Sequence, residues 1–427
     1  MHTLHVLRVT LRKFIMIKSA ATLFFFSFIF ISCNEKTNLP EGEIPTGIWR
    51  AVISQQGKKL PFNFEIKKEE KNYSLIIHNG EERIIVDEVV KKDDSLLITM
   101  PFFDSGFKLR YSEGKLTGNF QKYYTDDYIL PFEATYNIKK RFKRNCSEPE
   151  IDITGKWEVQ FKEKDGDTYP AIGKFTQNGY NVTGTFLTQT GDYRYLEGNI
   201  VKDKLQLSCF DGNHLFLFEG NVVGDKIVNG NFWHGKDTHE KWSGEKNSEA
   251  KLASAYDLTY IKEGYDKLAF SFPDLDSNLV SLDNPKFKDK VVLVQVFGTW
   301  CPNCVDETKF LSKWYKEHQN LDVEIVGLAY ESKADFQYAK SRVEKLKSRI
   351  GVDYQFLIAG VFDKKEAANS LPMLNHIISF PTLIFINKKG EVHKIHTGFT
   401  GPGTGENYTE FVREFDEIMA ELTGEPA

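Results

Sequence analysis

The strongest constraint on the fold is a buried-strand pattern that ends in two closely spaced cysteines. Residues 291–297, VVLVQVF, form a nearly continuous apolar run rich in β-branched side chains, which is typical of a strand covered on both faces. A Gly-Thr dipeptide interrupts the run, and Pro302 then stands where the first turn of a helix tolerates proline. The pattern predicts a strand that leads into a helix, with Cys301 at the helix N-terminus and Cys304 one turn further on.

The spacing of the two cysteines predicts a redox-active pair. Thiols at positions i and i+3 of a helix are close enough to form a disulfide with little backbone movement. We expect Cys301 to be the nucleophile, because unpaired backbone N–H groups and the helix dipole stabilise a thiolate at a helix N-terminus. Cys304 should then resolve the mixed disulfide. An inert buried pair or half of a zinc site is the alternative, but no second Cys-X-X-Cys or His-X3-His follows to complete a zinc site.

The N-terminus has the pattern of a lipoprotein signal peptide. Lys18 precedes a largely apolar run, residues 20–31, which ends at Ser32 and Cys33. The run is too short to span a bilayer as a helix. We therefore expect residues 1–33 to be the signal, Cys33 to carry the lipid anchor, and residues 34–44 to be a tether. This predicts an extracytoplasmic protein anchored to a bacterial membrane and facing the periplasm, with an ordinary signal peptide as the alternative.

An internal repeat with an offset of roughly 110 residues follows the tether. Thr46-Gly-Ile-Trp49 recurs as Thr154-Gly-Lys-Trp157, and Leu116-Thr-Gly-Asn-Phe120 recurs as Val228-Asn-Gly-Asn-Phe232. Short runs that alternate apolar and polar residues, separated by turn signals, predict that residues 45–145 and 150–247 are two all-β domains. Each should form an antiparallel barrel or sandwich.

The function of the repeated region stays open at this level. It is either a docking or ligand-binding module, or a spacer that holds the redox site away from the membrane. Its tryptophans are expected in the domain cores rather than in a ligand pocket. They are Trp49, Trp157, Trp233 and Trp242.

Composition argues against nucleic acid as a partner. The chain has 427 residues and a net charge of −5, whereas phosphate binding needs clustered lysine and arginine. One basic cluster exists, in residues 139–144, and we interpret it as the solvated end of a β-domain.

Two further cysteines and the histidines point to no additional cofactor. Cys146 and Cys209 either pair outside the cytoplasm or are unrelated buried thiols, and the sequence does not decide between these. The histidines lack acidic or cysteine neighbours in a ligand pattern, so we expect no metal site and no cofactor besides the Cys301–Cys304 pair.

The remaining chain changes from strands alone to strands that alternate with helices. Residues 248–264 are expected to be a linker in which residues 252–262 form a short helix, and residues 265–424 to be an α/β domain. Within that domain, residues 335–349 read as an amphipathic helix and residues 354–358 as an added strand.

Several ordered blocks in this domain resemble the TlpA/ResA-type thioredoxin-like family, which belongs with redoxin and AhpC/TSA-type domains. The blocks are Phe272-Pro-Asp-Leu-Asp276, Lys288-Asp-Lys-Val-Val-Leu293, Gly298-Thr-Trp-Cys-Pro-Asn-Cys304 and Phe380-Pro-Thr-Leu-Ile-Phe-Ile-Asn387. The anchor pattern and the tail of the domain are most similar to Bacteroidetes versions. The resemblance implies a membrane-tethered thiol-disulfide oxidoreductase, and it leaves the β repeat unexplained.

The resemblance also implies roles for individual residues. Pro381 would be the cis-proline that faces the two cysteines, although the sequence does not determine the isomer. Glu307 would be a partly buried carboxylate that tunes the thiols, and the alternative for it is a solvated residue of the first helical turn. Trp300, Pro302 and Phe380 would contact the substrate, and the bulk of Phe380 would narrow the choice of substrate.

The expected function is reduction of protein disulfides, with an upstream membrane thiol reductant that restores the dithiol. A thiol peroxidase is the first alternative. The Pro-X3-Thr/Ser-X2-Cys pattern of such enzymes is missing, because Thr299 is only two residues before Cys301. A ligand-binding lipoprotein with an accessory thioredoxin-like domain is the second.

Overall fold

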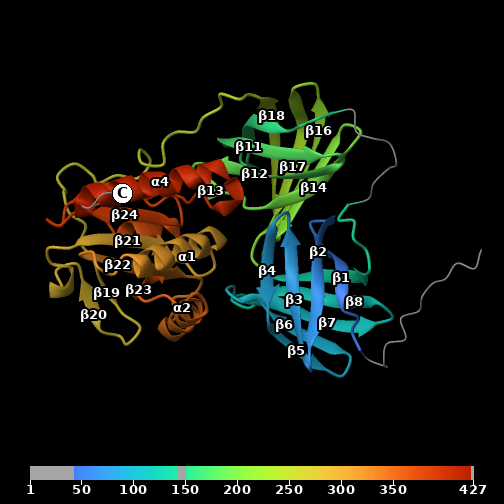
Figure 1. The fold of residues 1–427 in the computed structure, drawn as a ribbon, viewed down its shortest axis with the longest axis horizontal. Helices are drawn as coiled ribbons and strands as arrows, with labels where there is room; N and C mark the ends of the chain where they lie inside the picture. The colour runs from blue at the N-terminus through green and yellow to red at the C-terminus, as the bar shows by residue number, and fades with distance from the viewer. Residues whose placement is uncertain (1–42, 143–150, 425–427) are drawn as a thin grey trace, which may run out of the picture. The chain divides into compact units, whose positions relative to one another are not determined.

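The computed structural model describes residues 43–142 and 151–424, in which two antiparallel β-sheets are followed by an α/β domain (Figure 1). The expected signal peptide with Cys33, and nearly all of the expected tether, lie outside the described residues. No helix within 43–142 or 151–424 combines the length and the apolar composition needed to cross a bilayer.

The first sheet is formed by the first repeat. Its strands run in the order β4-β3-β2-β1-β9-β8-β7-β6-β5, so the first and last strands of the repeat pair with each other. The strands are β1 (Gly47–Gln55), β2 (Lys58–Glu69), β3 (Asn72–Asn79), β4 (Glu82–Val86), β5 (Glu88–Lys92), β6 (Ser95–Thr99), β7 (Ser105–Ser112), β8 (Lys115–Lys122) and β9 (Ile129–Tyr136).

The second sheet closes into a barrel. Pairing of β11 with β12 joins the two ends of the order β11-β10-β18-β17-β16-β15-β14-β12, and the short β13 pairs with β12 beside this ring. The strands are β10 (Gly155–Lys162), β11 (Thr168–Asn178), β12 (Asn181–Thr188), β13 (Gly191–Asp192), β14 (Leu196–Val201), β15 (Lys204–Phe210), β16 (Leu215–Val223), β17 (Lys226–His234) and β18 (Thr238–Lys246).

The two sheets share a tryptophan hydrogen bond as well as a strand order. Trp49 in β1 donates its indole N–H to the carbonyl of Pro45 at 3.1 Å, and Trp157 in β10 donates to the carbonyl of Ile153 at 2.8 Å. Both tryptophans therefore bond to the residue four positions earlier, and both are buried. The equivalence supports the duplication that the sequence predicts.

The barrel interior is filled by aromatic side chains. Phe218 and Phe232 stack with their ring centroids 4.0 Å apart, and Phe161 stacks on Tyr169 at 5.1 Å. All four tryptophans of the two repeats are buried core residues, as expected. The packing gives no support to a tryptophan-lined ligand pocket.

The described part of the basic cluster, residues 139–142, is not simply a solvated end, and Lys143 and Arg144 lie outside the described residues. Lys139 and Lys140 are exposed as expected, but Arg141 is only 4% exposed. Its guanidinium donates to Ser208 in β15 and lies 3.2 Å from Glu197 in β14, so it ties the first repeat to the second barrel. Acceptors that are distant in the sequence explain why this arginine is buried.

The segment between the second barrel and the α/β domain is not helical. Residues 252–262 form turns and an isolated bridge from Ile261 to Leu374. The N–H groups of Tyr260 and Lys262 are bonded to Asn375 and Met373, and these long-range partners replace the bonds of the expected helix.

The α/β domain is built on a sheet with the order β23-β22-β21-β24-β25. β21 (Val291–Phe297), β22 (Val323–Glu331) and β23 (Gln355–Val361) are parallel, whereas β24 (Thr382–Ile386) and β25 (Val392–Thr397) run antiparallel to their neighbours. A small hairpin, β19 (Ser271–Pro273) with β20 (Leu279–Ser281), and the 3-10 turn η1 (Pro285–Phe287) precede it.

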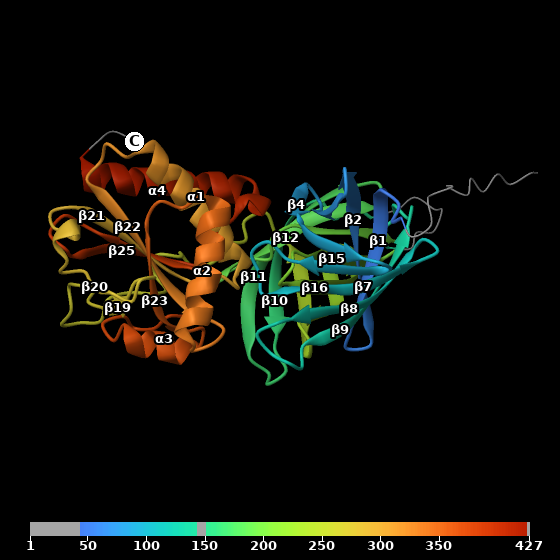
Figure 2. The same cartoon turned by 90° about the horizontal axis from the view of Figure 1, so that it is seen from below.

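Helices cover both faces of this sheet. α1 (Pro302–Glu317), α2 (Phe336–Ile350) and α4 (Glu406–Thr423) lie on one face, and α3 (Lys364–Ser370) lies on the other (Figure 2). Phe310 and Trp314 of α1 pack edge-on against Phe415 of α4, which fixes α1 over the sheet. A 3-10 turn, η2 (Pro402–Thr404), leads into α4. The strands predicted at 291–297 and 382–386 are β21 and β24, and the predicted amphipathic helix is α2.

Candidate active site

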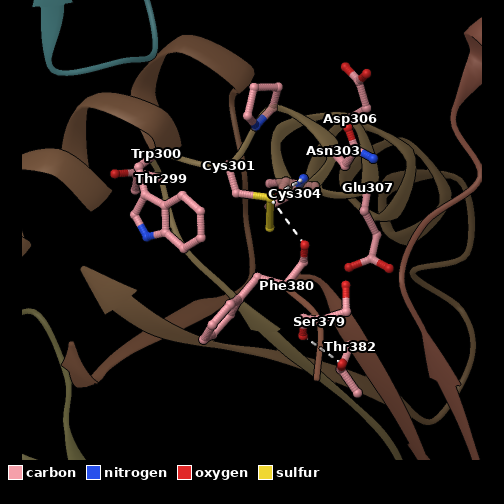
Figure 3. Close-up of a disulfide and its surroundings, with 12 residues drawn as sticks. Thr299, Trp300, Cys301, Asn303, Cys304, Asp306, Glu307, Ser379, Phe380 and Thr382 are labelled. Carbon is pink, nitrogen blue, oxygen red and sulfur yellow. Dashed lines mark hydrogen bonds between the residues drawn. A yellow bond between two sulfur atoms is a disulfide. The ribbon is translucent and has the colours of Figure 1, made fainter. Parts of the chain in front are cut away.

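Cys301 and Cys304 form a disulfide at the N-terminus of α1 (Figure 3). Their Cα atoms are 5.2 Å apart, and the N–H of Cys304 donates to Sγ of Cys301 at 3.2 Å. Cys301 is the N-cap of the helix and Pro302 its first residue, as the sequence predicts. Cys301 is 6% exposed and Cys304 is fully buried, so Cys301 is the more exposed of the two cysteines.

A proline loop faces the disulfide from the start of β24. The Phe380–Pro381 peptide bond is cis. The carbonyl oxygen of Phe380 lies 3.3 Å from Sγ of Cys301 (Figure 3). The hydroxyl of Thr382 donates to the carbonyl of Ser379 at 2.9 Å, and the N–H of Gly398 donates to the carbonyl of Pro381 at 2.9 Å. These bonds fix the backbone that lies directly opposite the disulfide.

Aromatic side chains form one side of the site. The indole N–H of Trp300 donates to the carbonyl of Tyr330 at 2.8 Å. The Trp300 ring lies edge-on to Phe380 at 5.6 Å and tilted against Phe362 at 5.3 Å. The Phe380 ring is only 8% exposed, whereas Phe362 is 46% exposed. Phe362, which follows β23, was missed by sequence reasoning because it lies outside the family-like blocks.

Glu307 is a buried carboxylate and not a solvated residue of the first turn. It is fully buried on α1, one turn after Cys304, and burial raises its pKa to about 8. Gln295 in β21 donates to one of its carboxyl oxygens at 2.9 Å, and the other oxygen has no hydrogen-bond partner. At neutral pH this carboxyl is largely protonated, so it adds little negative charge beside the cysteines.

A second buried carboxylate, Glu331, holds the turn that precedes the cysteines. Its two oxygens accept hydrogen bonds from the N–H of Thr299 at 2.8 Å and from the Thr299 hydroxyl at 2.7 Å. Burial raises its pKa to about 7. The parallel register that pairs Phe297 with Ala329 brings Glu331, the last residue of β22, beside Thr299, which follows β21. The sequence signal that could have identified Glu331 is an acidic residue at the end of an apolar strand.

The two residues between the cysteines face the second barrel. Pro302, expected to contact the substrate, is buried, and its carbonyl accepts a hydrogen bond from Arg194 at 3.3 Å. Asn303 is 8% exposed, and its amide donates to the carbonyl of Asp192 at 3.0 Å. Sequence reasoning missed Arg194 and Asp192, since nothing in their local pattern marks a contact with residues more than 100 positions away.

Cys209 is the one cysteine outside the disulfide among the described residues. Cys209 in β15 is fully buried, has no disulfide partner among the described residues, and has a thiol pKa raised by burial. Cys146 lies outside the described residues. Across residues 43–142 and 151–424, no group of three or more histidine, cysteine or acidic side chains is placed to hold a metal ion.

A family model agrees with this geometry. Residues 262–410 match the model described as Redoxin. This part of the chain is a redoxin domain. The matched range contains both cysteines, the proline loop and both buried carboxylates, but neither β repeat.

Curated relatives place the same domain among thiol-disulfide oxidoreductases. The chain is 25% identical over 157 residues to thiol-disulfide oxidoreductase ResA of Halalkalibacterium halodurans, a match that covers 37% of this chain and 81% of the relative. It is 25% identical over 153 residues to ResA of Bacillus subtilis, covering 36% of this chain and 77% of the relative. The chain is thus a homologue of ResA-type thiol-disulfide oxidoreductases.

Solved structures also match the redoxin domain. A thiol-disulfide oxidoreductase from Bacteroides fragilis is 19% identical, with a TM-score of 0.25, and the match covers 34% of this chain and 99% of that one. A thiol:disulfide interchange protein DsbE from Chlorobium tepidum is 15% identical, with a TM-score of 0.28, covering 36% of this chain and 98% of that one.

Proposed function

We propose that this chain is a lipid-anchored, extracytoplasmic enzyme that reduces disulfides in other proteins through the Cys301/Cys304 dithiol. The observation that carries the proposal is the disulfide at the N-terminus of α1, with the sulfur of Cys301 opposite the Phe380 carbonyl. A pair built this way can exchange electrons with another disulfide without a metal or an organic cofactor.

The geometry favours Cys301 as the attacking residue. Its sulfur accepts a hydrogen bond from the N–H of Cys304 at 3.2 Å and lies at the positive end of the α1 dipole. Both interactions stabilise a thiolate. Cys304 is fully buried and bonded to Cys301, so it is suited to the second step.

The reaction transfers two electrons from the dithiol to the substrate. The Cys301 thiolate attacks one sulfur of the substrate disulfide, which forms a mixed disulfide and releases one substrate thiolate. Cys304 then loses its proton and attacks Sγ of Cys301, which closes the Cys301–Cys304 disulfide and releases the second substrate thiolate. A membrane dithiol reductant returns two electrons and restores the reduced enzyme.

Glu307 and the aromatic side chains have supporting roles in this proposal. Burial raises the pKa of Glu307 to about 8, so a minority of the molecules carry an ionised carboxylate at neutral pH, and that ionised form is able to take the proton from Cys304 as the thiol attacks. Trp300 and Phe380 contact the substrate beside the disulfide, and the backbone of Phe380 pairs with an extended substrate segment. The Thr299 hydroxyl donates to Glu331, which gives no support to a peroxidase site around Cys301.

Trapping of a mixed disulfide tests the assignment of the two cysteines. Cys304→Ser should accumulate a covalent adduct with a flexible disulfide-bonded peptide, because the resolving step is removed. Cys301→Ser should form no adduct and lose all reductase activity. Cys209→Ser, which changes a buried thiol outside the site, is the matched control and should behave as the wild type. Absence of an adduct with Cys304→Ser would refute the assignment.

The reduction potential tests the direction of electron flow. Equilibration of the full chain with dithiothreitol or glutathione buffers should give a value near or below that of thioredoxin, at about −270 mV. A value near about −120 mV would instead make the protein an oxidant of nascent disulfides. The proposed direction would then be reversed.

Fractionation of cells tests the anchor. We propose the organisation predicted from the sequence, with a signal peptide at 1–33, a tether at 34–44, β-domains at 45–145 and 150–247, a linker at 248–264 and the redox domain at 265–424. If Cys33 carries lipid, Cys33→Ala should move the protein from the membrane fraction to the soluble fraction. Retention of the variant at the membrane would contradict lipidation at Cys33.

A further inference from the structure

A loop of the second barrel, residues 188–194, lies against the redox site and is called here the barrel loop. The carbonyl of Asp192 accepts a hydrogen bond from Asn303, which stands between the two cysteines, at 3.0 Å. The carbonyl of Thr190 accepts one from the hydroxyl of Ser379, two residues before the cis-proline, at 2.7 Å. The barrel loop therefore contacts both the cysteine motif and the proline loop.

The third backbone segment at the site also packs against the barrel loop. Gly398 donates to Pro381, and it approaches the barrel loop so closely that a Cβ on Gly398 would lie 2.8 Å from the carbonyl carbon of Thr190. A Cβ on Gly191 would lie 2.7 Å from Nδ2, the side-chain amide nitrogen, of Asn303. Both glycines have positive φ angles, +80° and +130°, so this close approach depends on glycine at both positions.

Buried polar contacts hold the barrel loop in place. The carboxylate of Asp192 accepts hydrogen bonds from the N–H of Arg194 at 2.6 Å and from the N–H of Gly401 at 2.7 Å. The Arg194 guanidinium, itself buried, forms an ion pair with Asp306 on α1 and another with Glu82 in β4. Bonds on both sides of the loop make it a fixed wall of the site.

The opposite side of the disulfide is aromatic and partly exposed to solvent. Trp300, Phe362 and Phe380 form that side, and Phe362 is 46% exposed. It offers apolar surface, and no bond from the barrel loop reaches it among the described residues. An incoming chain thus meets polar backbone on the wall side and aromatic rings on the other.

We infer that the barrel loop is a specificity element that closes the Asn303–Ser379–Gly398 side of the redox site. Substrates then approach only along Trp300 and Phe362. The favoured substrate class is a flexible polypeptide with an apolar side chain next to its cysteine, whereas a disulfide set in a compact protein surface collides with the wall. The inference rests on the proposed disulfide reductase function and gives the second barrel a role in it.

Displacement of the barrel loop tests the inference in the full-length chain. In Gly191→Val the added side chain displaces the Asn303 side-chain amide, which breaks its bond to Asp192, and it strains a backbone with φ of +130°, so the loop loses its contact with the cysteine motif. Gly166→Val is the matched control, because Gly166 lies in the same barrel with φ of +104° and has no atom within 4 Å of an added Cβ. Each reduced protein is mixed with insulin, as the compact substrate, and with hydroxyethyl disulfide, as the small one, and kcat/KM is measured for both.

The expected result is a change in the ratio of the two kcat/KM values. Gly191→Val should raise the ratio of insulin to hydroxyethyl disulfide by about fivefold, the effect of removing a steric penalty of about 1 kcal/mol. Gly166→Val should leave the ratio unchanged. An unchanged ratio in Gly191→Val, or an equal loss with both substrates, would overturn the inference, since the loop would then only support α1.

A second variant covers the case in which Gly191→Val fails to fold. Asp192→Ala removes the acceptor of Gly401 and should shift the ratio in the same direction, whereas Asp152→Ala, which removes a similar turn contact to Thr154, should not. If the wild type reduces insulin and hydroxyethyl disulfide but neither variant changes the ratio, only the inference fails. If the wild type reduces neither, the proposed function fails and the inference fails with it.

Discussion

Substitution of Glu307 by glutamine should make the oxidised protein less sensitive to alkaline pH. The carboxyl ionises near pH 4.5 in the unfolded chain, whereas burial raises its pKa to about 8 in the folded protein. Between these two pH values the folded state retains a proton that the unfolded state releases, so stability falls as pH rises through this window. Glutamine at position 307 keeps the shape and cannot ionise, so it removes this dependence.

The size of the effect follows from the two pKa values. One pKa unit corresponds to 1.36 kcal/mol, so the penalty grows by about 3 kcal/mol between pH 5 and pH 8. The difference in the free energy of unfolding between Glu307→Gln and the wild type should therefore rise by this amount over the same interval. Any cost of the substitution that does not depend on pH cancels in the comparison.

Urea unfolding at pH 5 and pH 8, followed by tryptophan fluorescence, measures this difference. The disulfide stays oxidised, so that neither cysteine titrates. Glu317→Gln is the control, because Glu317 lies on the same helix with a side chain that is 56% exposed, and it should change stability by less than about 0.5 kcal/mol at either pH. A rise of less than about 1 kcal/mol for Glu307→Gln would refute the account of Glu307 as a buried, protonated carboxyl.

Three further predictions concern the contacts around the site and the barrel core. Arg194→Met leaves the buried carboxylates of its ion pairs uncompensated and should cost about 3–5 kcal/mol in urea unfolding, whereas Arg413→Met, which breaks only surface ion pairs, should cost less than about 1 kcal/mol. Phe362→Ala should raise KM several-fold for a peptide disulfide flanked by phenylalanine and leave hydroxyethyl disulfide unaffected. Leu279→Ala, which removes another exposed apolar side chain of the same domain, 72% exposed in β20, should change neither. Trp157→Ala should destabilise the second barrel by about 3–5 kcal/mol, and a loss below about 1 kcal/mol would contradict its placement in the core.

The sequence by itself determined the local elements of the redox domain. The apolar run at 291–297 is β21, the run at 382–386 is β24, and α1 begins at Pro302 with Cys301 as its cap. These features depend on side-chain periodicity and on the preferences of helix caps and prolines. Because these effects act over a few residues, the sequence alone predicts them. The duplication of the β-domain could also be predicted from the sequence, because each copy repeats the same short strand and turn signals.

Only the tertiary structure decided which polar groups are buried and what they contact. Arg141 belongs to a basic cluster that the sequence predicts to be solvated, yet it is buried against Ser208 and Glu197. Glu331 becomes part of the site through the register of two parallel strands. The barrel loop is the clearest case, since it meets Asn303 and Ser379 through backbone carbonyls. Every residue has a backbone carbonyl, so a contact made by a carbonyl does not depend on which residue stands at that position and cannot be predicted from the sequence. Only the folded chain shows that the second barrel lies beside the disulfide.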